Sequence, residues 1–516
     1  MSRTHHRKVA VAALTGALAI TPFAAANAAP APTTETGPAS SLPPYVLPVA
    51  DGVTITSLLS VGDSPNGYRM VGIPDALGAM PGANGTVDIV MNHELKDSKG
   101  VVRAHGQKGA FVSTWTIDPK TGAVSGGADL ITSVRDWDYT AGAYEADNVA
   151  RSALYRLCSG SLTEDGQLFN RRTGNGYDGR IYFANEEGTT AGEAGPRTYG
   201  VALDGIAYEL PRMGRLPSEN TIVAPTRGDR TVVVANEDGS TDTSLLRVYW
   251  GTKTKDGSPV DRAGLTNGVL NVLTVAGVSN DAEFRSAYGK GTAVPVSFGE
   301  LDWNQSPAAQ STNGLASGGL GFTRIEDGNF DPRKPNDYYF LTTEGGNTTP
   351  DPTTGFTRDG GGLWQLSFKD VDRPELGGQL TLLLDGSEAP FLNKPDNMTI
   401  DNGGNMLIQE DPGGNDHLAR IVAYRIADGA TGVVAEYDAE QFSTGGANFI
   451  TTDEESSGII DVSRLWKRPN TFLFDAQVHA SAGDVELEEK GQLLTLTVQS
   501  WGQVYDAPKS GDGNRR

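Results

Sequence analysis

The chain has 516 residues, with 64 acidic against 42 basic side chains and a formal net charge of −22. An acidic excess of this size disfavours nucleic acid as a partner, because binding to a phosphate backbone is largely electrostatic. Cys158 is the only cysteine, which excludes an intramolecular disulfide. Four histidines remain beyond residue 28, too few for a histidine-rich transition-metal site: His93, His105, His417 and His479.

The first 28 residues have the pattern of an export signal. Arg3, Arg7 and Lys8 form a positive start, residues 9–20 are apolar, and residues 26–28 read Ala-Asn-Ala, a small-residue cleavage site. An uncleaved membrane anchor is the alternative, but the apolar stretch is short for a bilayer and no other segment is long enough to span one. These 28 residues contain no adjacent arginine pair, so we expect Sec-type export to the periplasm or the extracellular space.

Residues 29–44 are rich in Pro, Ala, Thr and Ser and are predicted to be a disordered linker. Residues 45–505 consist of short runs of Val, Ile, Tyr, Phe, Leu and Thr separated by Gly, Pro, Asn and Asp, which predicts an all-β domain. Short helices are expected around residues 148–156 and 281–288. Residues 506–516 are predicted to be a disordered tail.

A single large β-propeller fits this length and this pattern best, because blades of four strands add radially around one axis. The 65 glycines agree with a fold built from many turns. The repeats have no fixed sequence period, so the chain is not a WD40-type or kelch-type array. Two packed β-domains are the alternative on length alone.

Acidic turns follow six predicted strands. They lie in residues 89–94 (IVMNHE), 182–188 (YFANEEG), 232–239 (VVVANEDG), 324–328 (RIEDG), 339–346 (YFLTTEGG) and 407–414 (LIQEDPGG). Such residues close tight turns without any ligand. Strand ends that meet at a propeller axis would instead gather the oxygen ligands that Ca²⁺ requires. The recurrence of the pattern favours a site with several metal ions.

Two of these turns contain closely spaced oxygen ligands. The adjacent carboxylates of Glu186 and Glu187 repel each other, and either a cation or solvation would relieve that repulsion. Asp238, Ser240 and Asp242 alternate as in calcium loops, although the final bidentate Glu of an EF-hand is missing.

The Arg324-Ile325-Glu326 segment places a guanidinium and a carboxylate on the same face of a predicted strand. The two side chains form either a surface ion pair of little consequence or a site in which Glu326 binds metal and Arg324 grips a phosphate oxygen.

Motifs of other reaction classes are missing from the sequence. It contains no G-x-S-x-G elbow, no H-E-x-x-H helix and no G-x-x-x-x-G-K-S/T loop. A nucleophilic pair of Cys158 with a distant histidine lacks a local signature. Before any family resemblance is considered, the favoured interpretation of Cys158 is an inert thiol that packs in the core as a small hydrophobic side chain.

Several segments, in order, resemble the PhoX-type alkaline phosphatases. They are residues 92–94 (NHE), 158–160 (CSG), 186–187 (EE), 214–219 (GRLPSE), 322–326 (FTRIE), 395–397 (PDN) and 404–408 (GNMLI). The resemblance spans most of the chain after the signal. It implies a secreted propeller that holds Fe³⁺ and Ca²⁺ ions at its axis and hydrolyses phosphate monoesters.

The resemblance also implies roles for individual residues. Cys158, Glu219 and Glu326 would bind iron, and Arg324 would contact phosphate. The remaining carboxylates would hold calcium: Glu187, Glu94, Glu186, Asp238 and Asp396. The chain departs from the family pattern in two places, since residues 167–178 are inserted and Ser218 stands where a histidine is expected. Both departures leave the substrate open.

We therefore expect a monomeric, calcium- and iron-dependent phosphomonoesterase that acts on a small-molecule phosphate ester. Its metal ions would neutralise the phosphoryl group and activate an oxygen nucleophile. One alternative is a non-catalytic extracellular propeller in which Ca²⁺ ties strand ends together. Another is a phytase-like or lactone-hydrolysing propeller enzyme.

Overall fold

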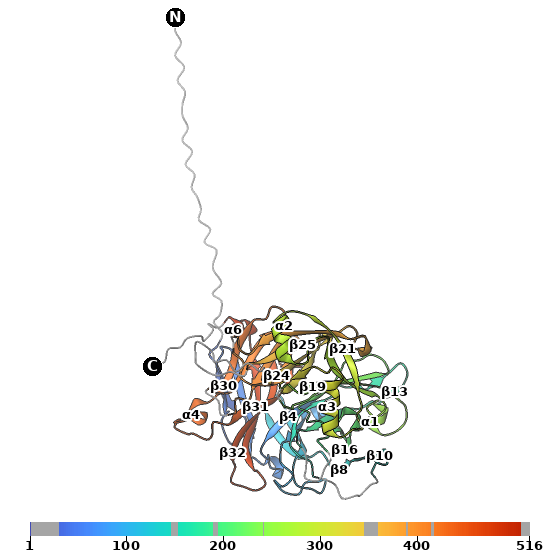
Figure 1. The fold of residues 1–516 in the computed structure, drawn as a ribbon. Helices are drawn as coiled ribbons and strands as arrows, with labels where there is room; N and C mark the ends of the chain where they lie inside the picture. The colour runs from blue at the N-terminus through green and yellow to red at the C-terminus, as the bar shows by residue number, and fades with distance from the viewer. Residues whose placement is uncertain are drawn as a thin grey trace.

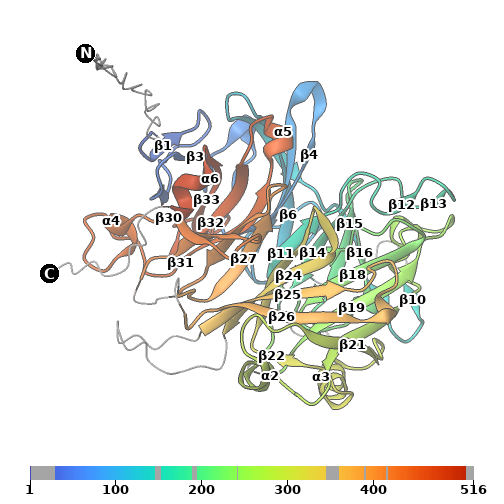
Figure 2. The ribbon, with the colours of Figure 1, turned by 90° about the horizontal axis from the view of Figure 1, so that it is seen from above.

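Antiparallel sheets are arranged around a common centre in the computed structural model of the protein (Figure 1, Figure 2). The structure describes Met1 and residues 30–145, 153–188, 195–240, 242–344, 360–388, 391–413 and 417–506. Within these residues the sheets form six blades. Four sheets of four or five strands are one blade each, and one ten-stranded sheet contains the other two blades. The predicted single large propeller is therefore confirmed.

The first three blades follow one another along the chain. Blade 1 consists of β4 (Pro74–Pro81), β5 (Val87–His93), β6 (Phe111–Asp118) and β7 (Ala123–Asp129). Blade 2 consists of β11 (Leu157–Leu162), β14 (Ile181–Glu186), β15 (Thr198–Ala202), β16 (Ile206–Glu209) and β8 (Ser133–Arg135). Blade 3 consists of β17 (Thr221–Val223), β18 (Arg230–Asn236), β19 (Ser244–Thr252), β20 (Val269–Val275) and β21 (Val294–Leu301).

The last three blades complete the ring. Blade 4 consists of β23 (Ile325–Asp331), β24 (Lys334–Glu344), β25 (Gly360–Phe368) and β26 (Gly378–Asp385), and β26 pairs with β21 of blade 3. Blade 5 consists of β27 (Pro395–Ile400), β28 (Asn405–Glu410), β29 (Arg420–Arg425), β30 (Thr431–Tyr437) and β2 (Val46–Pro48). Blade 6 consists of β31 (Glu454–Asp461), β32 (Thr471–Ser481), β33 (Glu489–Val498), β3 (Val53–Ser60) and β1 (Thr33–Thr36).

The two ends of the described chain close the ring together, because β3 pairs with β33 in blade 6. The edge of the same blade is β1, which pairs in parallel with β3. The prediction that residues 29–44 form a disordered linker is therefore wrong for Thr33–Thr36. The three threonines and one glutamate of this segment are all exposed, which suits an edge strand whose main chain finds partners on β3. The predicted signal and most of the predicted tail lie outside the described residues.

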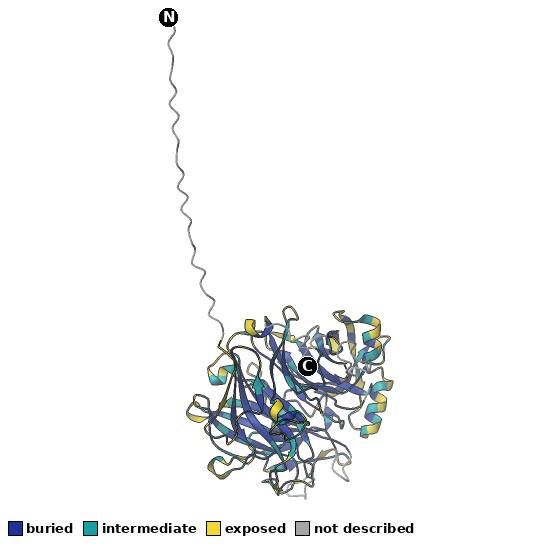
Figure 3. Ribbon diagram, turned by 90° about the vertical axis from the view of Figure 1, so that its left-hand side faces the viewer, coloured by how far each residue is buried: buried dark blue, intermediate teal, exposed yellow. Residues whose placement is uncertain are grey.

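Apolar clusters fill the space between neighbouring blades. Between blades 1 and 2, for example, Val90 and Val112 pack against Tyr182 and Tyr199. Comparable clusters lie between every other pair of adjacent blades, including the pair formed by blades 6 and 1. The strands are accordingly buried, whereas exposed residues concentrate in turns and short helices (Figure 3). Burial on both faces of each blade fixes the strand register, because a slip by one residue would turn apolar side chains outward.

Helices and minor strands lie in the connections. The helices are α1 (Pro259–Arg262), α2 (Asp281–Tyr288), α3 (Pro307–Ala316), α4 (Ala439–Phe442), α5 (Ser463–Trp466) and α6 (Trp501–Tyr505), with 3₁₀ turns η1 (Pro65–Gly67), η2 (Ala83–Gly85), η3 (Pro211–Met213) and η4 (Pro374–Leu376). The minor strands are β9 (Trp137–Asp138), β10 (Ala143–Tyr144), β12 (Phe169–Asn170), β13 (Asn175–Gly176) and β22 (Gly321–Phe322).

The prediction of a helix at 281–288 is confirmed by α2, whose Asn280 side chain caps the first turn. The helix expected around 148–156 lies partly outside the described residues, and its described end, residues 153–156, is not helical. The inserted stretch at 167–178 contains the small β12–β13 hairpin. None of the helices in the described ranges has the length and hydrophobicity that a bilayer crossing requires.

Candidate metal centre

The first strands of the blades lie on the inside of the ring and begin in a similar way. In five blades, an amide near the end of the second strand donates to a carbonyl just before the first strand. These hydrogen bonds run from Glu94 to Ile73, Glu187 to Arg156, Thr343 to Arg324, Asp411 to Lys394 and His479 to Asp453. The residue two positions after each of these carbonyls therefore occupies an equivalent place near the propeller axis.

Metal-ligating residue types occupy this equivalent place in all five blades: Asp75, Cys158, Glu326, Asp396 and Glu455. Blade 3 contributes Glu219, whose amide donates to the carbonyl of Asn236. Blades that are distant in sequence thus deliver their acidic or thiol side chains to the same end of the ring.

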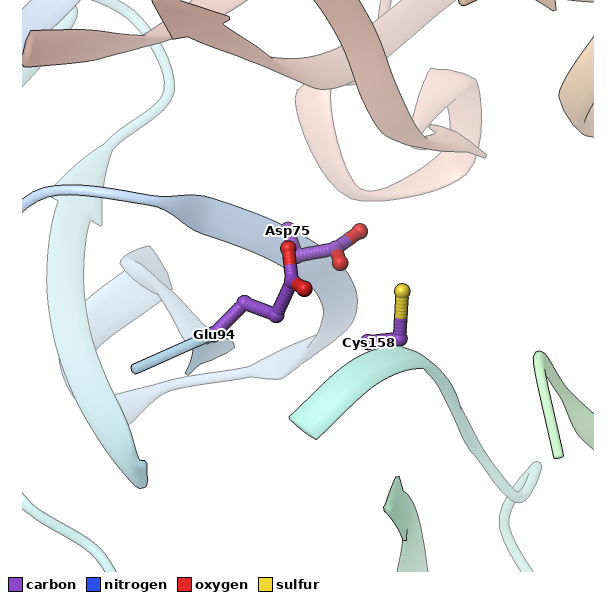
Figure 4. A group of neighbouring side chains, drawn as sticks. All are labelled: Asp75, Glu94 and Cys158. Carbon is purple, nitrogen blue, oxygen red and sulfur yellow. The ribbon is translucent and has the colours of Figure 1, made fainter. Parts of the chain in front are cut away.

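Asp75, Glu94 and Cys158 form one group, in which one carboxylate oxygen of each acid and the Cys158 Sγ lie within 4.8 Å of one another. Their side chains converge from the start of β4, the end of β5 and the start of β11 (Figure 4). The pKa of the Cys158 thiol is raised well above its ordinary value, first by burial and then by the charges of Glu187 and Glu219. Without a cation, the thiol therefore stays protonated.

Glu219, Glu326 and Asp396 form a second group with the same 4.8 Å spacing of their oxygens. Burial, followed by the charges of Asp396 and Glu326, raises the pKa of Glu219 well above its ordinary value. The charge of Asp75 also acts on Glu219, so the two groups belong to one continuous acidic centre.

Two arginines flank this centre. Arg156 contacts Glu94 at 2.6 Å through Nε and Glu187 at 2.5 Å through Nη2. Arg324 contacts both oxygens of Asp238 at 2.8 Å and Glu326 at 3.3 Å. The predicted proximity of Arg324 and Glu326 is therefore observed. Arg324 itself precedes β23 and has a φ of 54°, so the expected placement of both residues within one regular strand is wrong.

The buried acids of the centre lack enough partners within the described part of the protein. Asp75 Oδ2 and Glu219 Oε1 are buried and have no hydrogen-bond partner there. A buried carboxylate oxygen without a partner is costly, and a bound cation would remove that cost. The donor set also fits the expected ions, because carboxylate oxygens suit Ca²⁺ and a thiolate with carboxylates suits iron.

Glu186 lies outside both groups, contrary to its predicted metal-ligating role. Its Oε2 accepts from the Arg197 amide at 3.1 Å and from Arg197 Nε at 3.0 Å. Its Oε1 accepts from the Tyr155 amide at 3.1 Å and from Arg197 Nη2 at 3.2 Å. Both oxygens are thus fully occupied. The neighbouring Glu187 points the other way, toward Arg156, because side chains alternate along an extended chain.

His93 and the segment with Asp238 and Asp242 also have protein partners. His93 Nε2 lies 2.8 Å from the Ser113 hydroxyl, its ring stacks on Phe111, and burial lowers its pKa to about 3. These contacts identify it as a neutral core residue. Asp238 and Asp242 do not form a calcium loop, because Asp238 holds Arg324 while Asp242 bonds with Thr323.

The sequence analysis missed Asp75, Arg156 and Glu455. A local signal existed for Asp75, since Ile73-Pro74-Asp75 and Lys394-Pro395-Asp396 share the Pro-Asp pair at the start of an inner strand. Glu455 lies near the centre, because its charge contributes to raising the pKa of Asp396. It also lies 3.6 Å from His479, which in turn contacts Glu489 at 2.8 Å.

Residues 206–461 match the model of the family described as alkaline phosphatase PhoX. The fold is similar to that of Pseudomonas fluorescens PhoX in complex with vanadate, a transition state analogue, with a TM-score of 0.60 and 13% identity. The similarity covers 91% of this chain and 97% of that chain. These findings confirm the family resemblance and the propeller.

Other similarities are weaker and support no functional conclusion. A luciferin-regenerating enzyme matches with a TM-score of 0.31 and 10% identity, over 83% of this chain and 92% of that chain. A GH43 β-1,3-galactosidase matches with a TM-score of 0.33 and 10% identity, over 84% and 92% respectively. No curated protein sequence matches the chain.

Proposed function

Because the chain belongs to the family of PhoX-type alkaline phosphatases, we propose that it is a secreted phosphomonoesterase that depends on calcium and iron. The observation that carries this proposal is the grouping of Cys158 with Asp75 and Glu94, next to a second group of Glu219, Glu326 and Asp396, beside a guanidinium that is only partly buried. A purely structural calcium site would need neither a thiol nor an arginine.

The residues divide between the two kinds of ion according to their chemistry. Cys158, Glu219 and Glu326 would hold iron, since a thiolate is a ligand for iron rather than for calcium. Calcium would be held by the surrounding carboxylates: Asp75, Glu94, Glu187 and Asp396. Bound cations neutralise charge on the phosphoryl group and lower the pKa of a coordinated water.

Arg324 supplies the substrate contact in this proposal. Asp238 fixes the guanidinium through two parallel hydrogen bonds at 2.8 Å, so its orientation is set before substrate arrives. The side chain nevertheless remains 31% exposed, whereas that of Glu326 beside it is 2% exposed. A preorganised guanidinium binds two phosphate oxygens at once and stabilises charge that develops during phosphoryl transfer.

The acidic surroundings explain why cations are needed for this reaction. A phosphate monoester is a dianion near neutral pH, and the unliganded centre gathers at least six carboxyl groups: Asp75, Glu94, Glu187, Glu219, Glu326 and Asp396. Repulsion would exclude the substrate unless cations compensate these charges.

The proposal is tested with protein purified without chelator, by metal analysis and by turnover of an aryl phosphate monoester at alkaline pH. Glu326→Gln is expected to lose metal together with activity, whereas Arg324→Ala keeps the metals and loses turnover on the order of 10²-fold. Arg333→Ala is the matched control, because Arg333 pairs with Asp331 at the far end of the same strand. A metal-loaded parent protein without phosphomonoesterase activity would refute the proposal.

A further inference from the structure

Arg156 and Arg324 occupy matching places in blades 2 and 4. Each residue immediately precedes the first strand of its blade, and φ is 40° at Arg156 and 54° at Arg324. This left-handed conformation is unfavourable for a residue with a long side chain. The carbonyl of Arg156 accepts from the Glu187 amide and that of Arg324 from the Thr343 amide, both at 3.0 Å. The strands that follow also share a bulge, between Leu157 and Gly160 in one and between Ile325 and Gly328 in the other.

The polar groups behind the two arginines match as well. Asn92 Nδ2 donates to the Cys158 carbonyl at 2.8 Å, and Asn236 Nδ2 donates to the Glu326 carbonyl at 2.6 Å. Each asparagine oxygen in turn accepts from a buried tyrosine, Tyr182 at 3.0 Å and Tyr338 at 2.9 Å. The same network thus supports the ligand that follows each arginine, Cys158 in one blade and Glu326 in the other.

Each guanidinium is held in the same manner. Asp238 follows Asn236 by two residues and binds Arg324, just as Glu94 follows Asn92 by two residues and binds Arg156. Both arginines contact these carboxylates through Nε and Nη2. The Nη1 group therefore has no partner within the described residues. Both side chains are partly exposed, 36% for Arg156 and 31% for Arg324.

The two arginines border one shared space. Glu187, which binds Arg156, lies near enough to Asp238, which binds Arg324, for the charge of Asp238 to contribute to raising the pKa of Glu187. Both residues lie at the same end of the ring, because both directly precede inner strands that begin there. Acids of the centre contact both guanidinium groups and are more deeply buried than either, Glu94 and Glu187 at Arg156 and Glu326 at Arg324.

We propose that Arg156 is a second substrate-binding arginine, which together with Arg324 holds the non-bridging oxygens of a phosphate monoester. This inference rests on the proposed phosphatase function. A phosphate monoester dianion offers three such oxygens, so the Nη1 group of a second guanidinium finds an acceptor that a single arginine leaves unused. Two arginines also favour a doubly charged monoester over a singly charged diester.

The test measures binding of inorganic phosphate to the metal-loaded protein by titration calorimetry, alongside metal analysis. Arg156→Ala is expected to keep its metals and to bind phosphate at least about tenfold more weakly, the loss typical of one charge-assisted hydrogen bond. Arg156→Lys keeps the positive charge but lacks the planar guanidinium, so we expect its phosphate affinity to lie between those of Arg156→Ala and the parent. Arg333→Ala again serves as control and leaves phosphate affinity unchanged.

Three outcomes would overturn the inference. The first is a metal-loaded Arg156→Ala protein that binds phosphate as tightly as the parent. The second is loss of metal from both Arg156→Ala and Arg156→Lys, which would assign Arg156 to holding Glu94 and Glu187 in place. The third concerns the case in which Arg156→Ala loses metal but Arg156→Lys keeps it. In that case, a phosphate affinity of Arg156→Lys equal to that of the parent would overturn the inference. A parent that neither binds phosphate nor hydrolyses an aryl phosphate would instead remove the proposed function itself.

Discussion

Removal of cations should make the stability of this protein depend on pH in a direction opposite to that of most acidic side chains. In the metal-free centre, burial and the charge of Glu94 raise the pKa of Glu187 to about 8. Burial and the charge of Asp411 likewise raise the pKa of Glu455 to about 8. In the unfolded chain both groups return to a pKa near 4.5. Between these values the folded state binds more protons than the unfolded state, so the free energy of unfolding falls as pH rises.

The size of the effect follows from the shift at Glu187 alone. A rise of about 3.5 pH units, at about 1.4 kcal/mol per unit, gives an upper limit of about 5 kcal/mol lost between pH 4.5 and pH 8. This loss is comparable with the whole stability of a typical domain, about 5–15 kcal/mol. Bound Ca²⁺ opposes it, and at a free concentration one hundred times the dissociation constant one site contributes about 2.7 kcal/mol.

The assay is urea unfolding at pH 5, 7 and 9 after several hours with a chelator, and again with Ca²⁺ restored. The midpoint of the chelated protein should fall steadily from pH 5 to pH 9, whereas the calcium-loaded protein should change little. Glu187→Gln, which removes one titrating group, should flatten the decline. If the urea midpoint of the chelated protein stays level or rises with pH, the pKa values of the carboxyl groups in the acidic centre are not raised as proposed.

Two further predictions distinguish a metal-ligating role from a structural role, one at Cys158 and one at Glu186. Cys158→Ser should lose iron and the visible thiolate-to-iron absorption, and an unchanged spectrum with unchanged iron content would leave Cys158 as a core thiol. Glu186→Gln should keep its metals yet lower the free energy of unfolding, because the buried Arg197 guanidinium loses its nearer carboxylate partner and keeps Asp136 at 3.5 Å. The loss should stay below the roughly 3–5 kcal/mol that a buried charge without any partner costs. Loss of metal equal to that of Glu187→Gln would contradict the assignment of Glu186 to the ion pair.

The propeller could be predicted because its signals are local. Alternating apolar runs and glycine-bearing turns specify strands wherever they occur, and their number and spacing exceed what one sandwich holds. The blade count was not predictable in the same way, because the sheets contain either four or five strands and β26 joins blade 4 to β21 of blade 3. The strand Thr33–Thr36 escaped prediction because its stability comes from pairing with β3 rather than from its own composition.

The site was predicted only in part, since ligand residues differ from their neighbours through long-range contacts. Glu186 and Glu187 are indistinguishable in sequence, and only Arg197, eleven residues later, identifies the first of them as an ion-pair partner. Arg156 carries no signal of its own until its backbone conformation and its contacts are compared with those of Arg324.

The repeated start of the inner strands links the fold to the chemistry. One hydrogen bond before each strand directs the side chain two residues later toward the axis, so any acidic residue at that position joins the same centre. The apolar clusters between the blades prevent these strands from moving apart to relieve the resulting repulsion. Rigid packing therefore concentrates negative charge that cations can compensate, and folding and metal binding become coupled. Blades 2 and 4 also place an arginine just before this strand, Arg156 and Arg324, and in the function that we propose the same geometry turns their cationic groups toward the phosphate ester.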